Sequence, residues 1–498
     1  MQKEFRYNTI FSFLLNIVMI LSGFILPRLF LTFYGSVTNG LISSMTQFLN
    51  IIAFLDMGTT AVVGSTLYRP IVEKKLEQIN QIMSAAHRFF KKIAYILIIY
   101  VFLLAFFYPT IAKSEFDWTY TTTLIFAIAI SSFAQYYSGL VDQIFLSAAQ
   151  KEYIYSICSI VTIGFNTISS VILINIGASI QIVKIFTSFV FLLRPIFLRY
   201  YVNRHYHINR NTIYGDNPIP QRWSGIAQHI AFKILNGTDV VVLTLFCSLE
   251  SVSIYTVYNL VLNGIRTILL SLTNGIKPKL GYLWVQGQIK DIEKLYRWYE
   301  WVFHMALSIV MGCTMVLVIP FVKVYTLGVN DANYIQPVFS VIITMASMLF
   351  CTAQFGVIIV QAVNHYKETQ MYYIISASLN VVISVLMVIK YGLCGVAIGT
   401  LVAMLFQQVW TQAYMAKKIF NSGIFGAIKL LLVDILILLV GCVVMYRVNM
   451  QNVTYTAWLF YGIKCFAVFA FITIFVNIIM YKNKMLNLFY RIIKICDI

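Results

Sequence analysis

Five ionisable side chains lie inside long apolar stretches of this sequence, where a bilayer interior would surround them. Three are basic and two are acidic: Arg28, Lys233, Arg266, Asp56 and Asp239. A charge at the centre of a bilayer costs about 2.5 to 3.5 kcal/mol on insertion scales, so it normally faces a bundle interior or a wet cavity. Cations in such a cavity suit an anionic ligand. The planar guanidinium of arginine can donate two parallel hydrogen bonds to a phosphate.

The depth of each charge follows from the rise of a helix, about 1.5 Å per residue. Arg266 and Lys233 fall in the inner halves of their apolar stretches, and Arg28 falls in the outer third of the first one. A structural salt bridge within the bundle is the alternative for Arg266, Lys233 and Asp239. Snorkelling to the headgroups is the alternative for Arg28.

Four further charges lie nearer the ends of apolar stretches. Lys184 and Lys464 are expected to snorkel to the outer headgroups, because each lies close to an outer end. Asp142 and Asp434 are expected to be interfacial or hydrogen-bonded structural acids. These four are therefore left out of the candidate site.

The composition is that of an integral membrane protein. The 498 residues are 60% hydrophobic and 11% charged, with a mean hydropathy of +0.81, whereas soluble domains are about a quarter charged. The first apolar run is too long for a signal peptide and reads as a spanning helix. We expect an all-α polytopic protein of about 14 spanning helices. They lie near 8–33, 40–68, 90–112, 119–147, 153–176, 179–201, 224–249, 251–276, 299–322, 334–362, 368–389, 393–416, 424–446 and 455–480.

The basic residues predict the orientation. With a cytoplasmic N-terminus, 27 of the 36 lysines and arginines fall in inner segments and four in outer ones, namely Lys113, Lys323, Lys390 and Arg447. This asymmetry is a strong positive-inside signal and places both ends of the chain in the cytoplasm. The net charge of +18 is therefore explained by the orientation of the chain in the membrane. Membrane lipids are expected partners, and nucleic acid is not expected to be one.

The order of helices and loops predicts four regions. They are an N-terminal six-helix lobe (1–201), a cytoplasmic linker (202–223), a C-terminal six-helix lobe (224–416) and two additional helices with a cytoplasmic tail (417–498). A parallel repeat of the two lobes is suggested by Asn166, Ser170 and Gly177, which recur as Asn380, Ser384 and Gly392. Chance similarity of two apolar helices is the alternative interpretation.

Motifs of soluble chemistry are absent from the sequence. It has no phosphate-binding GxxxxGK[ST] loop, no HExxH and no GxSxG, so neither an ATPase nor a hydrolase is indicated. The eight cysteines include no CxxC pair, and the six histidines are dispersed. We therefore expect no metal, no cofactor and no enzymatic activity.

Several stretches together resemble one family along essentially the whole chain. They are "YGSVTNGLISSMTQFLNIIAFLDMGTTAVV" (34–63), "TDVVVLTLFCSLESVSIYTVYNL" (238–260), "KPKLGYL" (277–283) and "QAVNHYKETQMYYIISASLNVVISVLMVIKYGLCGVAIGT" (361–400). The chain resembles the polysaccharide-biosynthesis flippases (O-antigen or capsule repeat-unit flippases) of the multidrug/oligosaccharidyl-lipid/polysaccharide (MOP) exporter superfamily.

That resemblance implies a MATE-like fold, with two six-helix lobes around a central cavity plus two C-terminal helices. It implies an undecaprenyl-pyrophosphate-linked oligosaccharide as substrate, moved across a bacterial cytoplasmic membrane by alternating access. The polymerase and other export-pathway proteins are then expected partners. By position the resemblance carries over best to Arg28 and Arg266, whereas Lys233 is added from its depth.

We therefore interpret Arg28, Lys233 and Arg266 as a cationic cavity for the pyrophosphate. Asp56 and Asp239 would offset that positive charge, or they would bind and release protons and so couple transport to a proton gradient. Two alternatives are a cation-coupled multidrug exporter of the same fold and a membrane-embedded polysaccharide polymerase. The polymerase is disfavoured because all outer loops are short, the longest lying near 323–333.

Overall fold

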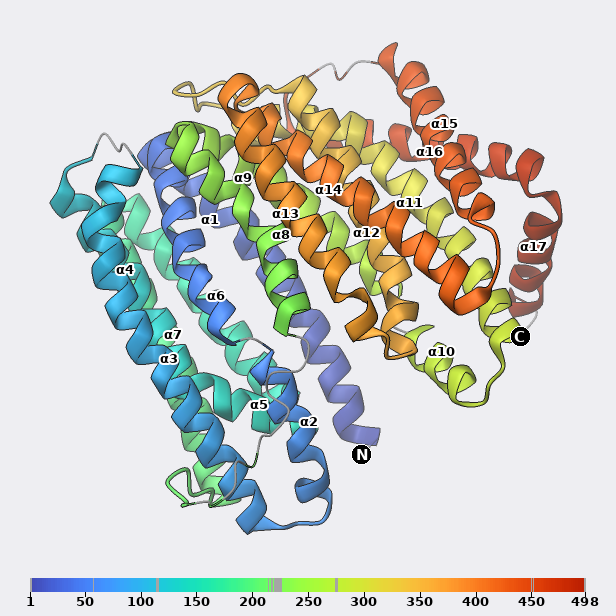
Figure 1. Cartoon of the computed structure of the whole chain (residues 1–498). Coiled ribbons are helices and arrows are strands. Elements are labelled where there is room, and N and C mark those ends of the chain that lie inside the picture. The colour runs from blue at the N-terminus through green and yellow to red at the C-terminus, as the bar shows by residue number, and fades with distance from the viewer. Residues whose placement is uncertain are drawn as a thin grey trace. The chain divides into compact units, whose positions relative to one another are not determined.

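Helices joined by short turns and loops make up the part of the chain that can be described. The computed structural model describes residues 2–56, 58–112, 116–213, 215, 218, 226–273, 276–448, 450 and 452–496, and none of these residues forms a strand (Figure 1). Helices satisfy their own backbone hydrogen bonds, which is the condition for crossing hydrocarbon. The all-α prediction is confirmed.

The number of apolar helices agrees with a multi-pass membrane protein. Eleven helical segments of the described chain are long and apolar enough to cross a membrane. One of them, Arg6–Asp56, contains two helices joined at a kink. The helices α8 (Ile226–Phe246) and α9 (Leu249–Ser271) stand outside the eleven, yet their 21 and 23 residues suffice for a crossing. About 14 spans is compatible with this arrangement.

The chain forms two compact units. The first comprises Met1–Thr256 with Val329–Ala332, and the second comprises Val257–Gly328 with Asn333–Ile498. The predicted regions 1–201, 202–223, 224–416 and 417–498 are not tested by this division and stay predictions. Two charges used for the orientation, Lys113 and Arg222, lie outside the described residues, as does much of the linker 202–223.

The first unit is built around one long, interrupted helix. Its α1 packs along α6, α6 packs on α7, and α4 packs between α3 and α7 (Figure 1). The elements of this unit are α1 (Gln2–Asn50), η1 (Ile51–Asp56), α2 (Thr59–Val72), α3 (Leu76–Ile111), α4 (Trp118–Ala134), η2 (Gln135–Gly139), α5 (Leu140–Ala148), α6 (Glu152–Asn175), α7 (Ile180–Tyr206), α8 and the start of α9.

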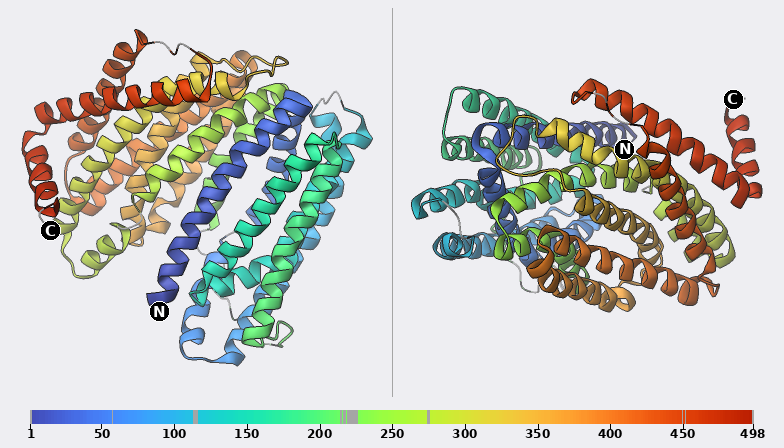
Figure 2. Two further views of the ribbon diagram at one scale, coloured as in Figure 1. Left: turned by 180° about the vertical axis from the view of Figure 1, so that it is seen from behind. Right: turned by 90° about the horizontal axis from the view of Figure 1, so that it is seen from above.

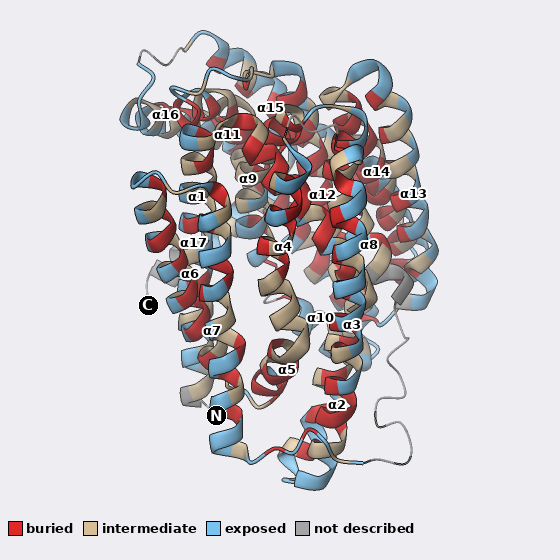
Figure 3. Cartoon of the chain, turned by 90° about the vertical axis from the view of Figure 1, so that its left-hand side faces the viewer, coloured by how far each residue is buried: buried red, intermediate tan, exposed pale blue. Residues whose placement is uncertain are grey.

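The outer faces of these helices are apolar, as a lipid environment requires. In α3, Leu97, Val101 and Leu104 are buried, whereas Ile99 and Phe106 are more than 60% exposed (Figure 3). Exposed apolar side chains in continuous stripes are not stable in water. The exposed face of α3 therefore identifies it as a lipid-facing helix.

The kink in α1 divides it into two separate passes. Gly35 has φ 82°, and a Cβ at this position would lie 2.8 Å from the carboxylate of Asp331. That carboxylate accepts hydrogen bonds from the backbone N–H and the hydroxyl of Ser36, both at 2.6 Å. Asp331 thus caps the helix that begins after the kink, where unsatisfied N–H groups and the helix dipole attract a negative charge.

Small and hydroxyl-bearing residues hold the second half of α1 against α8 and α9. Asn39 donates to Ser253 (2.8 Å), and the hydroxyls of Ser44 and Thr244 are 2.7 Å apart. A Cβ on Gly40 would lie 1.8 Å from the carbonyl oxygen of Leu249. Close backbone approach at small residues, joined by hydroxyl hydrogen bonds, is the usual way in which helices associate within a membrane.

The second unit packs α12 against α14 and α14 against α13, while α15 and α16 lie along α11 (Figure 2). Phe469 of α16 is fully buried where Gly312 of α11 and Gly441 of α15 leave room for its ring. The elements are the rest of α9, α10 (Ile276–Val285), α11 (Ile289–Tyr325), α12 (Pro337–Ala362), α13 (Tyr366–Tyr391), α14 (Leu393–Tyr414), η3 (Met415–Phe420), α15 (Phe425–Tyr446), α16 (Tyr455–Met480) and α17 (Lys482–Cys496).

The contact at Gly40 generates a test of this packing. Replacing a helical glycine by alanine normally stabilises a helix by up to about 1 kcal/mol. For Gly40→Ala we expect the opposite sign, a loss of about 1–3 kcal/mol, because the new methyl group overlaps the Leu249 carbonyl. The thermal unfolding midpoint of the purified protein measures this. Gly264→Ala is the matched control because nothing lies within 4 Å of that position, and equal midpoints for the two variants would contradict the packing.

Candidate functional site

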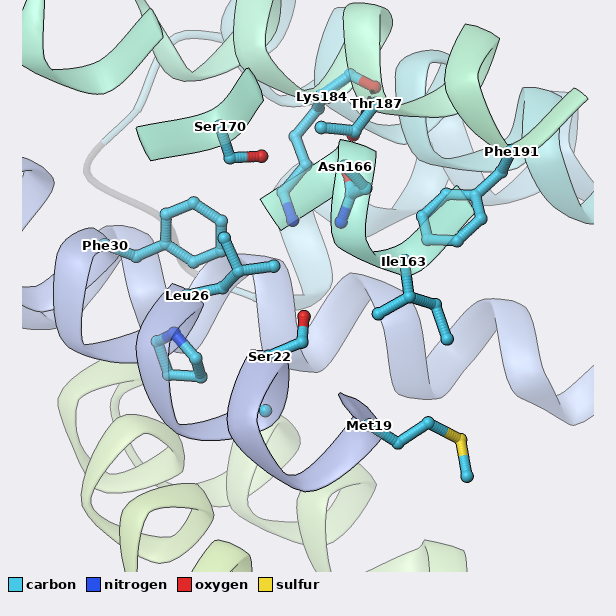
Figure 4. A pocket seen from close by; sticks show the side chains of 12 residues that line it. Met19, Ser22, Leu26, Phe30, Ile163, Asn166, Ser170, Lys184, Thr187 and Phe191 are labelled. Atoms are coloured by element: carbon cyan, nitrogen blue, oxygen red, sulfur yellow. Dashed lines mark hydrogen bonds between the residues drawn. The ribbon is translucent and has the colours of Figure 1, made fainter. Parts of the chain in front are cut away.

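A pocket with a polar floor lies between α1, α6 and α7 of the first unit (Figure 4). Its volume is about 390 Å³. The polar residues at the pocket are Ser22, Asn166, Ser170, Lys184 and Thr187. The remaining lining residues are Met19, Gly23, Leu26, Pro27, Phe30, Ile163 and Phe191.

Two of the polar groups in this pocket are buried without a protein partner. Asn166 is 5% exposed and Ser170 is 0% exposed. Neither the Asn166 Oδ1 atom nor the Ser170 hydroxyl has a hydrogen-bond partner among the described residues. A buried polar atom without a partner costs about 1–3 kcal/mol. These atoms therefore point to a ligand or to water.

A single cation accompanies these groups. The Lys184 Nζ atom lies 4.4 Å from the centre of the Phe30 ring, a cation–π contact between α7 and α1. No carboxylate of the described residues pairs with it, and the pocket lining contains no acid. Figure 4 shows the Lys184 amine beside the Asn166 amide. The lysine is thus directed into the pocket, whereas the sequence predicted that it would snorkel to the headgroups.

Contacts at both ends of the helices hold the pocket open. Near the start of α1, Asn8 donates to the carbonyl of Gln150 (3.0 Å) and accepts from the backbone of Tyr153 (2.8 Å). Near the other end, the Tyr34 hydroxyl donates to the carbonyl of Ala178 (2.6 Å). In between, the Thr167 hydroxyl donates to Ser22 (2.8 Å). These hydrogen bonds join α1 to α6 and to the turns at both ends of α6, so two walls of the pocket are attached to each other.

Arg266 lies in the second unit, on α9, and is half-buried. Its guanidinium donates to the hydroxyl of Ser347 (2.6 Å) and to the side-chain oxygen of Asn263 (3.4 Å), and it lies 5.0 Å from the centre of the Phe350 ring. The contact with α12 fixes the position of the guanidinium. Because arginine stays protonated in proteins, a positive charge is held at this place in the helix bundle.

The two other predicted cations lie in the first unit, outside the pocket lining. Arg28 belongs to the same stretch of α1 as Pro27 and Phe30, is half-buried, and lies one residue beyond the lining residue Pro27. Lys233 of α8 is exposed. The sequence therefore pointed to Arg28, a residue of α1 next to the pocket lining. It did not predict that Lys184, Asn166 and Ser170 lie together in one pocket.

The two predicted acids have local partners that are visible in the structure. Asp56 ends η1, and its carboxylate accepts from the hydroxyl and the backbone N–H of Thr60 in the first turn of α2. Asp239 of α8 is 5% exposed and accepts from the Tyr255 hydroxyl of α9 at 2.7 Å. Both contacts tie neighbouring helical segments together, as capping and interhelical hydrogen bonds do.

Two acids that sequence analysis treated as structural are paired deep in the protein. Asp142 forms a buried ion pair with Arg210, which follows α7. Asp434 of α15 contacts His304 and accepts from Ser308 of α11 at 2.6 Å. Buried charges normally have such partners. Lys184 differs from them because it faces a cavity and neutral groups.

A second cavity in the first unit has a different character. It has a volume of about 530 Å³ and an almost entirely apolar lining from α3, α4 and α7, including Phe102, Phe126, Phe133 and Pro195. The π-helical segment η2 contributes Tyr137 and Ser138 to its wall. Such a lining suits a hydrocarbon chain and contains no charged side chain.

Comparisons with known proteins identify the fold. No model of a protein family and no curated protein matches the sequence. A solved structure of the lipid II flippase MurJ, in an inward closed conformation, matches with a TM-score of 0.68 and 14% identity, over 96% of this chain and 99% of that chain.

Multidrug transporters share the fold as well. The MATE multidrug transporter DinF-BH, in complex with R6G, matches with a TM-score of 0.57 and 14% identity, over 84% of this chain and 97% of that one. The MATE transporter VcmN of Vibrio cholerae matches with a TM-score of 0.55 and 14% identity, over 84% and 97%. The chain is thus a multi-pass membrane protein with the fold of the MurJ flippase and the MATE transporters. At these identities the likeness establishes the fold and not the substrate.

The Asp239–Tyr255 contact allows the structural role of Asp239 to be tested. Tyr255→Phe removes a hydrogen bond to a buried carboxylate, so we expect a loss of about 1.5–3 kcal/mol, read as a lower thermal midpoint. Tyr446→Phe is the control, because that tyrosine is 87% exposed. Asp239→Asn keeps an acceptor for Tyr255 and should unfold near the wild-type temperature. If Tyr255→Phe unfolds at the wild-type temperature, the contact does not stabilise the fold.

Proposed function

We propose that this protein is a flippase for an undecaprenyl-pyrophosphate-linked oligosaccharide. It would move completed repeat units of a capsule, O-antigen or exopolysaccharide from the inner to the outer leaflet of a bacterial cytoplasmic membrane. Arg28, Lys233 and Arg266 would bind the pyrophosphate in turn during alternating access. Both termini would lie in the cytoplasm.

One observation carries the choice of an anionic substrate. Lys184 brings a positive charge into a pocket whose lining contains no acid, and no carboxylate of the described residues neutralises it. Placing an uncompensated charge among apolar helices is costly, so its presence indicates that a negative charge visits this region during the working cycle. The fixed guanidinium of Arg266, held by Ser347, fits the same requirement.

The fold adds support at the level of mechanism. A protein described as a lipid II flippase shares this fold over nearly the whole of both chains, so helices arranged in this way are compatible with moving a lipid-linked headgroup. The apolar cavity between α3, α4 and α7 could accommodate part of a prenyl chain, because hydrocarbon is the ligand that its lining suits.

The alternative is a cation-coupled multidrug exporter, since MATE transporters share the same fold. A site for cationic drugs needs acids at the cavity surface. Asp56 and Asp239 are the candidates, and each is engaged in a contact between helical segments. Resistance to cationic dyes upon overexpression would favour this alternative, whereas the lysine in the pocket disfavours it.

The test is a measurement of where lipid-linked saccharides accumulate. Depletion of the protein from its host should trap completed repeat units on the inner leaflet, as determined by mass spectrometry with spheroplasts to assign the leaflet. Units that reach the outer leaflet but remain unpolymerised would instead indicate a polymerase. An unchanged distribution would contradict the flippase proposal.

The same transport measurement tests the role of one residue, Arg266, through the Arg266→Ala variant. The substitution removes a charge-assisted hydrogen bond to substrate phosphate, worth about 1.5–3 kcal/mol, so we expect at least a tenfold loss of transport with trapped inner-leaflet units. Lys464→Ala is the matched control, because Lys464 lies in α16 with an exposed side chain. Normal transport by a well-expressed Arg266→Ala variant would remove Arg266 from the site.

A further inference from the structure

The two units contain one helix pair in two versions. In the first unit the pair is α6–α7, and in the second it is α13–α14. The polar residues of the first helix recur at matching positions, Asn166 and Ser170 in α6 and Asn380 and Ser384 in α13. Each pair is followed by a glycine with positive φ in the turn, Gly177 (81°) and Gly392 (52°). Both turns thus contain a glycine with positive φ, although the turn after α6 spans 176–179 and the turn after α13 is Gly392 alone.

In the second unit the two helices of this pair, α13 and α14, pack directly against each other. Asn380 donates to the Thr400 hydroxyl at 3.1 Å, and Ser384 donates to the Val396 carbonyl at 3.3 Å. A Cβ on Gly399 would lie 2.1 Å from the Ser384 hydroxyl, so only glycine allows α14 to come so close. The Asn/Ser pair therefore serves helix association here.

The first unit has a lysine at the corresponding place. Lys184 follows Gly177 by the same seven residues by which Gly399 follows Gly392. The long side chain prevents the close approach that Gly399 permits, and Asn166 and Ser170 are left facing a pocket of about 390 Å³ (Figure 4). The same polar pair that holds two helices together in the second unit is thus available to a ligand in the first.

We propose that this pocket binds one monosaccharide unit that carries an anionic group, either a carboxylate or a phosphate. This inference rests on the proposed function and assigns the pocket to the saccharide rather than to the pyrophosphate. The buried Asn166 Oδ1 atom needs a hydrogen-bond donor, which a carboxylate or a fully ionised phosphate lacks and a sugar hydroxyl provides. Lys184 needs a negative charge, which a neutral sugar lacks.

The remaining lining fits such a ligand. Ser170 and Thr187 present hydroxyls that pair with ring hydroxyls, while Phe191 offers an aromatic surface to the apolar face of a pyranose. The volume lies at the lower end of the range of about 300–1,000 Å³ typical of small-molecule pockets, which suits a single ring rather than an oligosaccharide. A lipid acyl chain would leave the buried amide and hydroxyl unsatisfied.

Equilibrium binding to the purified full-length protein in nanodiscs tests the proposal. The probes are glucuronate, glucose 6-phosphate, glucose, acetate and inorganic phosphate, each titrated calorimetrically. We expect glucuronate or glucose 6-phosphate to bind at least about tenfold more tightly than glucose, acetate or phosphate, because only these two combine hydroxyl donors with a charge. The tighter of the two identifies the source of the negative charge.

Variants locate the binding to the pocket. Lys184→Gln should lower the affinity for the anionic sugar about tenfold and leave that for glucose unchanged, whereas Asn166→Ala should weaken both sugars. Lys464→Ala should bind the probe as the wild type does, because that lysine is exposed on α16. Should Lys184→Gln fail to fold, Ser170→Ala provides a milder loss of one hydrogen bond in the same pocket.

Three results would overturn the inference. They are binding of acetate or phosphate that is as tight as that of the anionic sugar and is lost in Lys184→Gln, the absence of binding by every sugar probe, and unchanged affinity in both Lys184→Gln and Asn166→Ala. The flippase proposal is judged separately, by trapped lipid-linked units in Arg266→Ala cells. Trapping by Arg266→Ala without any sugar binding at the pocket would refute the pocket assignment and leave the transport function standing.

Discussion

The lack of water in the hydrocarbon core is the constraint on which the rest of this structure depends. Backbone groups must find partners inside the protein, so the described chain is helical throughout. Side chains face the same requirement. Asn39 pairs with Ser253, and Ser44 pairs with Thr244, so polarity placed in an apolar bundle becomes an attachment between helices. A polar group that is left without such a partner then points to a task other than folding.

The paired acids and the pocket lysine differ in this respect. Asp142 forms an ion pair with Arg210, and Asp434 contacts His304 and accepts a hydrogen bond from Ser308, so both acids have partners where they are buried. Lys184 has only the ring of Phe30 and neutral neighbours. The contrast separates acids that are paired within the bundle from a lysine that faces a pocket without an acid, and it is the basis of the proposal of an anionic substrate.

The repeated helix pair illustrates how one scaffold can serve two purposes. Gly399 allows α14 to approach α13 until Ser384 is covered, whereas Lys184 keeps the corresponding serine, Ser170, open to a pocket. The two pairs differ in the residue at this position and also in the turn, which spans 176–179 in the first pair and is Gly392 alone in the second. If the two pairs are copies of one repeat, one copy can stabilise the bundle while the other provides the ligand site proposed above.

Hydropathy alone determined the fold class, since apolar runs of this length have no stable form in a membrane other than helices. The sequence also indicated which charges are embedded and which pair, Asn166 and Ser170, recurs in the second half. Only the tertiary structure decided their roles. Asp331 caps the helix after Gly35 from 295 residues away, and Lys184 turns into a pocket although its distance from the helix end suggested snorkelling. Depth is a local property of the chain and can be read from the sequence, whereas direction and partners depend on which helices lie alongside.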